Sequence, residues 1–394
     1  RVVRRLTGQY AFYAPILLPS DRDALADSPP LQAAVMSVTY AMNPRNTPLF
    51  ELAGARVERL LVDPRTALFQ FEGYLSMEDY RKVPYSPGRV TLGTLWEPRD
   101  FATRQQRAQL IGPVCDAQSA LGASVVIAPY VLVTDVGHAW LPIAVDLARE
   151  ALASDRRHPM AVAVCVDIDA VLTATHRQTL CDAFGQLNPE LFLLIAVNFD
   201  EVEASPEEAR SVVDLVTRLS AIAPVVQMYA GRAGLSAIAA GAAGYAGGGL
   251  ELESHPKRYF REGLVNLHVN TYYLPGCMLR LPVRLADTVA RQVPAALGAD
   301  KGLPATKVHR RRLSAALAAK HAEVRALGAL EGTARASWLQ ARLEDALEIC
   351  ERARSELDDG SDDPPLSSGA FHYLEVLREV AGGPAARRPE HPDF

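Results

Sequence analysis

The stretch PVVQMYAGRAGLSAIAAGAAGYAGGGLELE, from Pro224 to Glu253, decides the fold that this sequence predicts. It contains two short apolar runs, and a helical segment of small residues joins them. Each run is followed by glycine, first Gly231 and then Gly247 to Gly249. The order strand, helix, strand, with glycine after both strands, would present backbone N–H groups where a ligand can approach them.

Apolar runs of the same kind recur along the chain before this stretch. They are continuously apolar, as expected of parallel strands that are covered on both faces. Segments long enough for helices separate them, and this alternation predicts a parallel sheet. Together with the two runs of the opening stretch, eight strands are predicted: Phe12–Leu18, Val57–Asp63, Val90–Leu95, Ser124–Tyr130, Ala161–Asp167, Phe192–Asn198, Val225–Tyr229 and Ala243–Gly247.

Some of the intervening helices can be predicted in detail. Phe101–Leu121 and Leu141–Ala153 follow helical spacing, and Pro206–Ala221 begins with Ser205 as N-cap and a proline in its first turn. Ala33–Tyr40 is also apolar, and it suits either a strand or the helix between the first two strands. Eight strand–helix units favour a closed barrel over an open doubly wound sheet.

The opening stretch resembles the seventh and eighth strands of a (β/α)8 barrel of the TIM-barrel superfamily, where phosphate groups often bind. The resemblance implies an anion site made by Gly231, Arg232, Gly247, Gly248 and Gly249. Backbone N–H groups would bind the phosphate and the arginine would supply charge. Close packing of a helix on a strand also requires small residues, and it is the alternative explanation of this composition.

The predicted barrel does not account for the whole chain. We expect a (β/α)8 barrel over residues 1–300, an insertion around residues 72–89, a helical appendage over residues 301–382 and a mobile tail over residues 383–394. The insertion is rich in tyrosine and turn formers, and long insertions after barrel strands often carry function. A surface excursion packed by its own tyrosines is the alternative.

Composition narrows the classes of function. The chain has 394 residues and a formal net charge of −5, so any nucleic-acid site must be a local basic patch. Its five cysteines are widely spaced and form no CxxC pair, which argues against a cysteine-built metal site and is typical of a reducing cytoplasm. No run of 18 apolar residues suggests a membrane span. No motif names a cofactor.

In a barrel the active site lies where the carboxyl ends of the strands meet. Asp63 ends the second predicted strand and precedes a proline, so it is a candidate base, nucleophile or metal ligand. A turn with a local ion pair to Arg65 is the alternative.

The fifth and sixth predicted strands end in further polar residues. Asp167 and Asp169 lie two residues apart and would point the same way in an extended strand, while Asn198 ends the next strand. Paired carboxylates can share a proton or bind a cation. For Asp169, capping of the following helix is the alternative. We expect Asp63, Asp167, Asn198 and Arg232 to converge on one cavity.

The densest basic cluster is Lys307, Arg310, Arg311 and Arg312, near the start of a predicted helix. Positive charge there opposes the helix dipole, so it suggests contacts with nucleic-acid phosphates or an acidic partner. A solvated helix start is the alternative. The long C-terminal helices could pack on the barrel, on a second copy of the chain or on a partner protein.

These patterns predict a barrel enzyme that acts on a phosphorylated or nucleotide-like substrate by carboxylate acid–base or nucleophilic chemistry. One alternative is a protein that modifies or recognises nucleic acid. Its outline is similar to barrels of the tRNA-guanine transglycosylase type, whose aspartates attack a sugar carbon, but the zinc site and glycine signatures of that family are not matched. Another alternative is a non-catalytic barrel subunit of a complex.

Overall fold

The computed structural model describes residues 11–91, 95–154, 158–247, 271–298, 309–357, 366 and 371–382. Its centre is an eight-stranded sheet in the order β3-β2-β1-β8-β7-β6-β5-β4, and all neighbours in it are parallel. The strands are β1 (Phe12–Leu17), β2 (Ala34–Ser37), β3 (Leu60–Asp63), β4 (Val126–Ile127), β5 (Met160–Asp167), β6 (Leu191–Val197), β7 (Val225–Gln227) and β8 (Gly244–Gly247).

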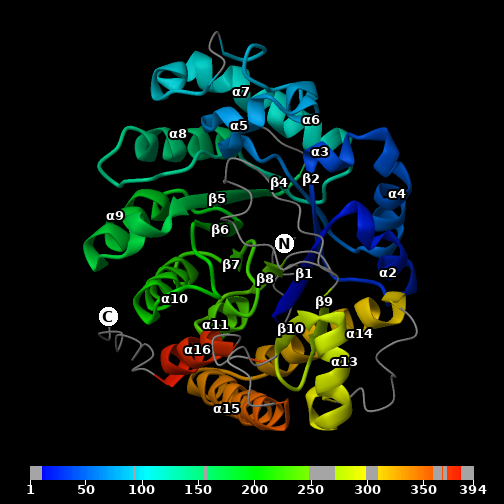
Figure 1. Cartoon of the computed structure of the whole chain (residues 1–394). Coiled ribbons are helices and arrows are strands. Elements are labelled where there is room, and N and C mark those ends of the chain that lie inside the picture. Colours follow the sequence, from blue (N-terminus) through cyan, green and yellow to red (C-terminus); the bar gives the residue numbers. More distant parts are fainter. Residues whose placement is uncertain are drawn as a thin grey trace.

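The two outer strands of this order meet and close the sheet into a barrel. Leu61 of β3 forms a parallel bridge with Val125, directly before β4. The amide of Ser124 donates to the carbonyl of Leu60 at 2.8 Å. The chain is therefore a (β/α)8 TIM-like barrel followed by C-terminal helices, as the sequence predicted (Figure 1).

One predicted strand is wrong. In Val90–Leu95, the described residues Val90, Thr91 and Leu95 lie in bends rather than in a strand. The second barrel strand is instead β2. It lies within Ala33–Tyr40, for which a strand and a helix were both considered, and there the chain forms four strand residues followed by the short helix α3 (Val38–Ala41). All four residues of β2 are buried, and they pair with both β1 and β3. This pairing on both sides favours a strand over a helix here, and a short apolar run in the sequence does not reveal it.

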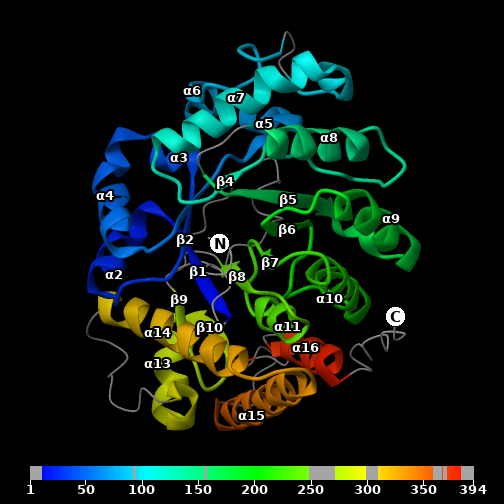
Figure 2. The same cartoon turned by 180° about the vertical axis from the view of Figure 1, so that it is seen from behind.

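Helices surround the barrel (Figures 1 and 2). The helix predicted to begin after Ser205 does so, because the Ser205 hydroxyl accepts from the amide of Glu208 and the Glu208 carboxylate accepts from the amide of Ser205. The helices that follow α3 as far as β8 are α4 (Thr47–Arg56), α5 (Glu72–Leu75), α6 (Glu78–Lys82), α7 (Arg104–Ala120), α8 (Trp140–Ala153), α9 (Ala174–Gly185), α10 (Pro206–Ser220) and α11 (Ala233–Ala239), and α2 (Arg22–Asp27) precedes β2.

Alternate residues of each strand face two different cores. One set fills the barrel interior, as Phe12, Ile16, Leu61, Cys165 and Ile195 do. The other set packs under the helices in a larger continuous core that also contains residues of the C-terminal helices. Leu61 and Cys165 point inward, so Asp63 and Asp167, two residues further on, point toward the same interior at the ends of their strands.

The C-terminal part packs on the barrel itself. It comprises a hairpin of β9 (Thr271–Leu274) and β10 (Leu279–Pro282), then α13 (Val283–Gln292), α14 (His309–Gly328), α15 (Thr333–Leu357) and α16 (His372–Gly382). Helix α14 contacts β1, α2 and α11, and so completes the outer ring of helices, while α15 and α16 cover α11 from outside (Figure 1). The predicted domain boundaries themselves stay a prediction.

The insertion around residues 72–89 forms α5 and α6 and packs through its tyrosines. Tyr74, Tyr80 and Tyr85 are all buried, and the Tyr85 hydroxyl donates to the carbonyl of Pro64 at 2.9 Å. The insertion thus supports the loop that follows β3. Among the described residues, no helix combines the length and apolar character needed to cross a bilayer.

Candidate functional site

The candidate site lies at the barrel mouth, the end at which the carboxyl ends of the strands meet. Asp63 ends β3 there and is only 1% exposed. One carboxylate oxygen, Oδ1, accepts the amide of Arg65 at 2.9 Å and the hydroxyl of Tyr130 at 2.7 Å. The other, Oδ2, accepts the hydroxyl of Tyr229. Three donors from three loops therefore hold this buried carboxylate in one orientation.

Arg65 lies beside the same carboxylate. Its Nε is 4.0 Å from Asp63 Oδ2, its Nη1 donates to the Tyr80 hydroxyl at 3.2 Å, and its guanidinium lies over the rings of Tyr40 and Tyr229. The turn and ion pair considered for Asp63 are thus both present. The turn and the ion pair still leave the Asp63 carboxylate at the barrel mouth, because the hydroxyls of Tyr130, after β4, and Tyr229, after β7, donate to it there.

Asp167 and Asn198 form a second, more exposed pair at the barrel mouth. Asn198 Nδ2 donates to Asp167 Oδ2 at 2.6 Å, and the amide of Asp169 donates to Asp167 Oδ1 at 3.1 Å. Asp167 therefore caps the helical turn after β5. The sequence had suggested Asp169 for this capping role. Burial raises the pKa of Asp167 above its ordinary value, and the two hydrogen bonds only partly oppose this.

Cys165 connects the two carboxylates. It lies in the barrel interior at 1% exposure, and burial, the charge of Asp63 and the charge of Asp167 all raise the pKa of its thiol. Burial and the charge of Asp63 also raise the pKa of the Tyr130 hydroxyl. Asp63 and Asp167 thus both act electrostatically on one buried thiol.

Backbone strain is concentrated at this end of the barrel. Arg65, Asn198 and Tyr229 have φ values of 50°, 63° and 56°, in the left-handed region that side chains disfavour. They follow β3, β6 and β7, and each contacts Asp63 or Asp167. Strain of this kind typically costs about 1–3 kcal/mol per residue and persists where the surrounding structure enforces it, often at functional sites.

The predicted anion site at the end of β7 has a partner within the chain. The amides of Arg232 and Ala233 donate to the carboxylate of Glu201 at 2.9 and 2.8 Å. Gly231 allows this approach, because a Cβ there would lie 1.8 Å from Glu201 Oε1. Glu201 is 4% exposed and comes from the loop after β6, so it ties that loop to the start of α11.

Arg232 is not brought to the aspartates. Its Nε donates to the carbonyl of Met278 at 2.9 Å, and its guanidinium lies 4.3 Å from the ring centre of Tyr273 in the C-terminal hairpin. Gly247 packs against β1 and the segment after β7, since a Cβ would lie 2.7 Å from the carbonyl of Ala230 and 3.0 Å from the Tyr13 ring. Gly248 and Gly249 lie outside the described residues.

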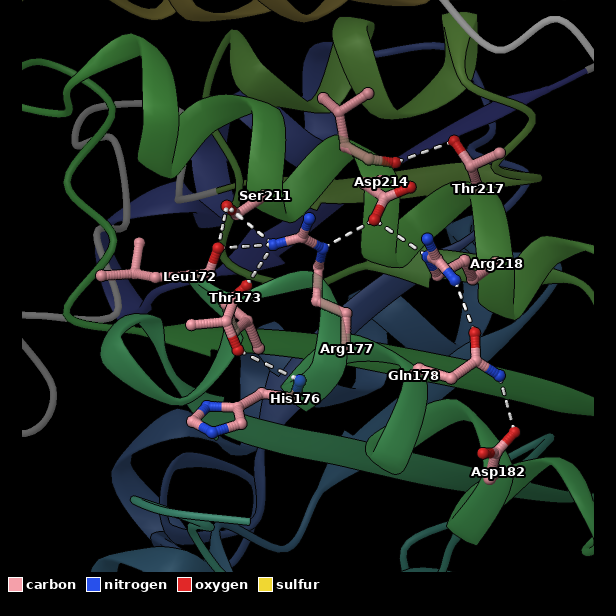
Figure 3. Close-up of polar contacts among 12 residues, drawn as sticks. Leu172, Thr173, His176, Arg177, Gln178, Asp182, Ser211, Asp214, Thr217 and Arg218 are labelled. Atoms are coloured by element: carbon pink, nitrogen blue, oxygen red, sulfur yellow. Dashed lines mark hydrogen bonds and ion pairs between the residues drawn. The ribbon is translucent and has the colours of Figure 1, made fainter.

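A polar network between α9 and α10 holds the turn that follows β5 (Figure 3). Arg177 of α9 donates to the carbonyls of Val171 and Leu172, both at 2.7 Å, and to Asp214 of α10 at 2.6 Å. Arg218 donates to the same Asp214 oxygen at 2.9 Å. Burial alone raises the pKa of Asp214, but the hydrogen bonds from the two arginines hold it below its ordinary value.

Other predicted features lie away from this site. Within the described part of the chain, no three His, Cys, Asp or Glu side chains gather closely enough to hold a metal ion. A groove of about 730 Å³ is lined by Gly276, α14 and α15 residues such as Ala318, Ala322 and Arg352, none of which belongs to the barrel mouth. Lys307 and the side chains of Arg310, Arg311 and Arg312 lie outside what the structure describes.

Sequence reasoning missed the two tyrosines that bind Asp63. Tyr130 and Tyr229 are the last residues of two predicted strands, so their place at the barrel mouth was predictable. That both bind the same carboxylate was not predictable, because β5 and β6 separate β4 from β7 in the sheet. Local sequence patterns do not show which hydroxyl reaches Asp63.

Comparisons with known proteins add no family. No family model matches the chain, and no curated protein matches it. Among solved structures, the chain is similar to the carboxyl transferase domain of Rhizobium etli pyruvate carboxylase with 3-bromopyruvate, at 11% identity and a TM-score of 0.36. The same domain with pyruvate and biocytin gives 12% identity and a TM-score of 0.33.

In both comparisons the alignment covers 96% of this chain and 62% of the other chain. The chain thus spans less than two thirds of the length of the structures it matches. At these scores the similarity carries no argument about activity. The (β/α)8 barrel with C-terminal helices rests on the strand pairing itself, and no specific family is assigned.

Proposed function

We propose that the chain is an enzyme whose barrel mouth performs carboxylate acid–base chemistry, with Asp167 as the group that exchanges a proton with the substrate. The observation that carries the proposal is that Asp63 ends β3 and Asp167 ends β5, and that Leu61 and Cys165, two residues before them, face the same barrel interior. In a (β/α)8 barrel this is the position at which catalytic residues lie.

The two aspartates suit different roles. Asp63 is buried and accepts three hydrogen bonds, so its orientation is fixed and it suits a positioning role. Asp167 is half-buried, and the raised pKa brings its titration closer to neutral pH, where a general acid or base works best. Two carboxylates whose surroundings differ in this way commonly divide these tasks.

The chemistry available to Asp167 is proton transfer. When ionised, its carboxylate can take a proton from a substrate O–H, N–H or activated C–H group, and it can return that proton to a leaving or product atom. Asn198 Nδ2 keeps one carboxylate oxygen oriented during the exchange. The other chemistry proposed for Asp167 is nucleophilic attack by a carboxylate oxygen.

A phosphorylated or nucleotide-like substrate remains part of the proposal. Its support is the glycine composition after β7 and β8. A phosphate at the amides of Arg232 and Ala233 would have to displace Glu201. Gly248 and Gly249, the other glycines of the predicted anion site, lie outside the described residues.

The proposal is tested by incubating the purified protein with a mixture of cellular metabolites and following each mass over time. The decisive comparison is Asp167→Asn against Asp169→Asn, the same change two residues away at an exposed side chain. We expect at least one metabolite to be converted, Asp167→Asn to slow conversion by about 10²–10⁴-fold, and Asp169→Asn to leave it nearly unchanged. No conversion, or equal conversion by Asp167→Asn, would overturn the assignment.

A further inference from the structure

We propose that Cys277 and Cys350 form a reversible disulfide that fixes α15 to the hairpin of β9 and β10. Cys277 lies in the turn between these two strands, and Cys350 lies in α15. The bond ties the C-terminal helices to the hairpin covalently, and its reduction releases them. The inference goes beyond the proposed chemistry of the barrel mouth and does not depend on it.

The first observation is that the two thiols lie together in the interior. Cys277 and Cys350 are both fully buried, and the Cys350 thiol donates to the carbonyl oxygen of Cys277 at 3.6 Å. A hydrogen bond between the two side chains, followed by burial, raises the pKa of the Cys350 thiol above its ordinary value. Two cysteines that lie 73 positions apart in the sequence are thus in side-chain contact. A disulfide requires such contact, because it joins only cysteines whose side chains face each other.

The second observation is that neighbouring helices hold the hairpin turn in place. Arg342 of α15 donates to the carbonyl of Gly276 at 3.2 Å, directly before Cys277. Tyr373 of α16 donates to the carbonyl of Met278 at 2.7 Å, directly after it. The turn is therefore fixed on both sides of its cysteine. A fixed geometry favours the reaction between the two sulfurs, because they do not have to find each other by diffusion.

The third observation is a route for a small oxidant. A groove of about 730 Å³ lies between the hairpin turn, α14 and α15, and Gly276 and Ile349 line it. These residues directly precede Cys277 and Cys350 in the sequence. Burial slows the oxidation of a thiol, and the groove brings a molecule the size of hydrogen peroxide next to the buried pair.

Hydrogen peroxide is the oxidant that we assign to this reaction. The sulfur of one cysteine attacks a peroxide oxygen, the O–O bond breaks, and the products are a sulfenic acid and one water. The sulfur of the other cysteine then attacks the sulfenic sulfur, and a second water leaves as the S–S bond forms. Two thiols are oxidised and one peroxide is reduced. A thiol reductant reverses the reaction by thiol–disulfide exchange.

Oxidation of the intact protein tests the proposal. The reduced chain is treated with hydrogen peroxide, unfolded, alkylated in the absence of reductant and digested with trypsin. We expect residues 262–280 to be recovered cross-linked to residues 343–352, the tryptic peptides that contain Cys277 and Cys350. The oxidised chain should have a Tm about 2–5 °C above that of the reduced chain, because the bond closes a long loop. Dithiothreitol should remove both the cross-link and the rise in Tm.

Variants separate this pair from the other cysteines. Cys181 is the most exposed of the five cysteines, at 7%, so it would react first if exposure alone decided. Cys350→Ala should abolish the rise in Tm that follows oxidation, whereas Cys181→Ala should retain it. Should Cys350→Ala fail to fold, the peptide map of the unaltered chain decides by itself. Oxidation of either cysteine without the cross-link, no oxidation of either, a cross-link to a different cysteine, or an unchanged Tm in the cross-linked chain would overturn the proposal.

Discussion

At the scale of single residues, the barrel mouth separates two aspartates by their surroundings. Asp63 is enclosed by donors from three loops, whereas Asp167 shares its carboxylate between one side chain, one backbone amide and solvent. Residue type does not distinguish these cases. Burial and the number of donors do, and on these grounds we propose Asp167 as the carboxylate that exchanges a proton.

The raised pKa of Asp167 predicts how stability depends on pH. The folded state holds this proton more tightly than the unfolded chain does. The destabilisation caused by ionising Asp167 is therefore absent well below the ordinary carboxyl pKa and grows as pH rises through the folded pKa. Asp167→Asn should therefore raise Tm at pH 7 and not near pH 3.5. The gain should stay below about 1 kcal/mol, since solvent screens a half-exposed group. A loss of stability at pH 7 would contradict this.

Gly231 and Glu201 should behave as one unit. A methyl group at Gly231 would collide with the Glu201 carboxylate, so Gly231→Ala should destabilise the fold by about 1–3 kcal/mol through forced repacking. In a Glu201→Ala background the same substitution should cost much less, with a coupling energy of about 0.5–3 kcal/mol. Denaturant unfolding of the two single variants and the double variant measures this coupling, and additive effects would show that the contact is absent.

At the scale of elements, hydrogen bonds from neighbouring elements keep the loops of the barrel mouth in place. The loop after β5 is fixed from behind by Arg177, which joins two of its carbonyls to Asp214 on α10 (Figure 3). The loop after β6 is tied to α11 through Glu201, and the loop after β3 rests on the insertion through Tyr85. Each site loop is thus held by a neighbouring element.

Arg177→Met should weaken the fold and the site together. The substitution leaves Asp214 with one arginine and removes charged hydrogen bonds, which predicts a loss of about 1–3 kcal/mol. Arg354→Met removes an exposed ion pair with Glu351 on α15 and should cost less than about 0.5 kcal/mol. Urea titration of both variants compares them. Faster hydrogen exchange in residues 168–173 of the Arg177 variant should accompany the loss, and equal effects of the two substitutions would refute the network's role.

At the scale of the whole molecule, the C-terminal helices and the barrel share a core. Buried residues of α15 and α16, such as Leu343 and Leu374, belong to the same continuous cluster as the outer faces of the barrel strands. The Tyr373 hydroxyl donates to the carbonyl of Met278, which also accepts from Arg232. These contacts join α16 to the segment after β7 through the C-terminal hairpin.

A shared core predicts a single unfolding transition. Leu374 is fully buried, so Leu374→Ala should cost about 2–5 kcal/mol and lower the Tm of the one transition seen by calorimetry. Arg378→Ala, at an exposed position of the same helix, should leave it nearly unchanged. Two separate transitions, of which Leu374→Ala shifts only one, would instead show that residues 301–382 fold as an independent domain.

The sequence by itself determined the architecture. Continuous apolar runs separated by capped helices predicted eight parallel strands, and seven of the eight runs overlap barrel strands. These signals are local, because burial on both faces and helix capping are properties of a few adjacent residues. The run at Val90–Leu95 was wrongly included, since a strand is defined by its neighbours and β2 pairs on both sides.

Only the tertiary structure decided how the site is built. Placing Asp63 and Asp167 at strand ends was possible from the chain alone, but their partners Tyr130, Tyr229 and Asn198 come from other strands of the closed barrel. The same holds for Glu201, which occupies the amides where the glycine pattern had indicated a phosphate. Hydrogen bonds and desolvation depend on groups distant in sequence, and barrel closure is what brings those groups together.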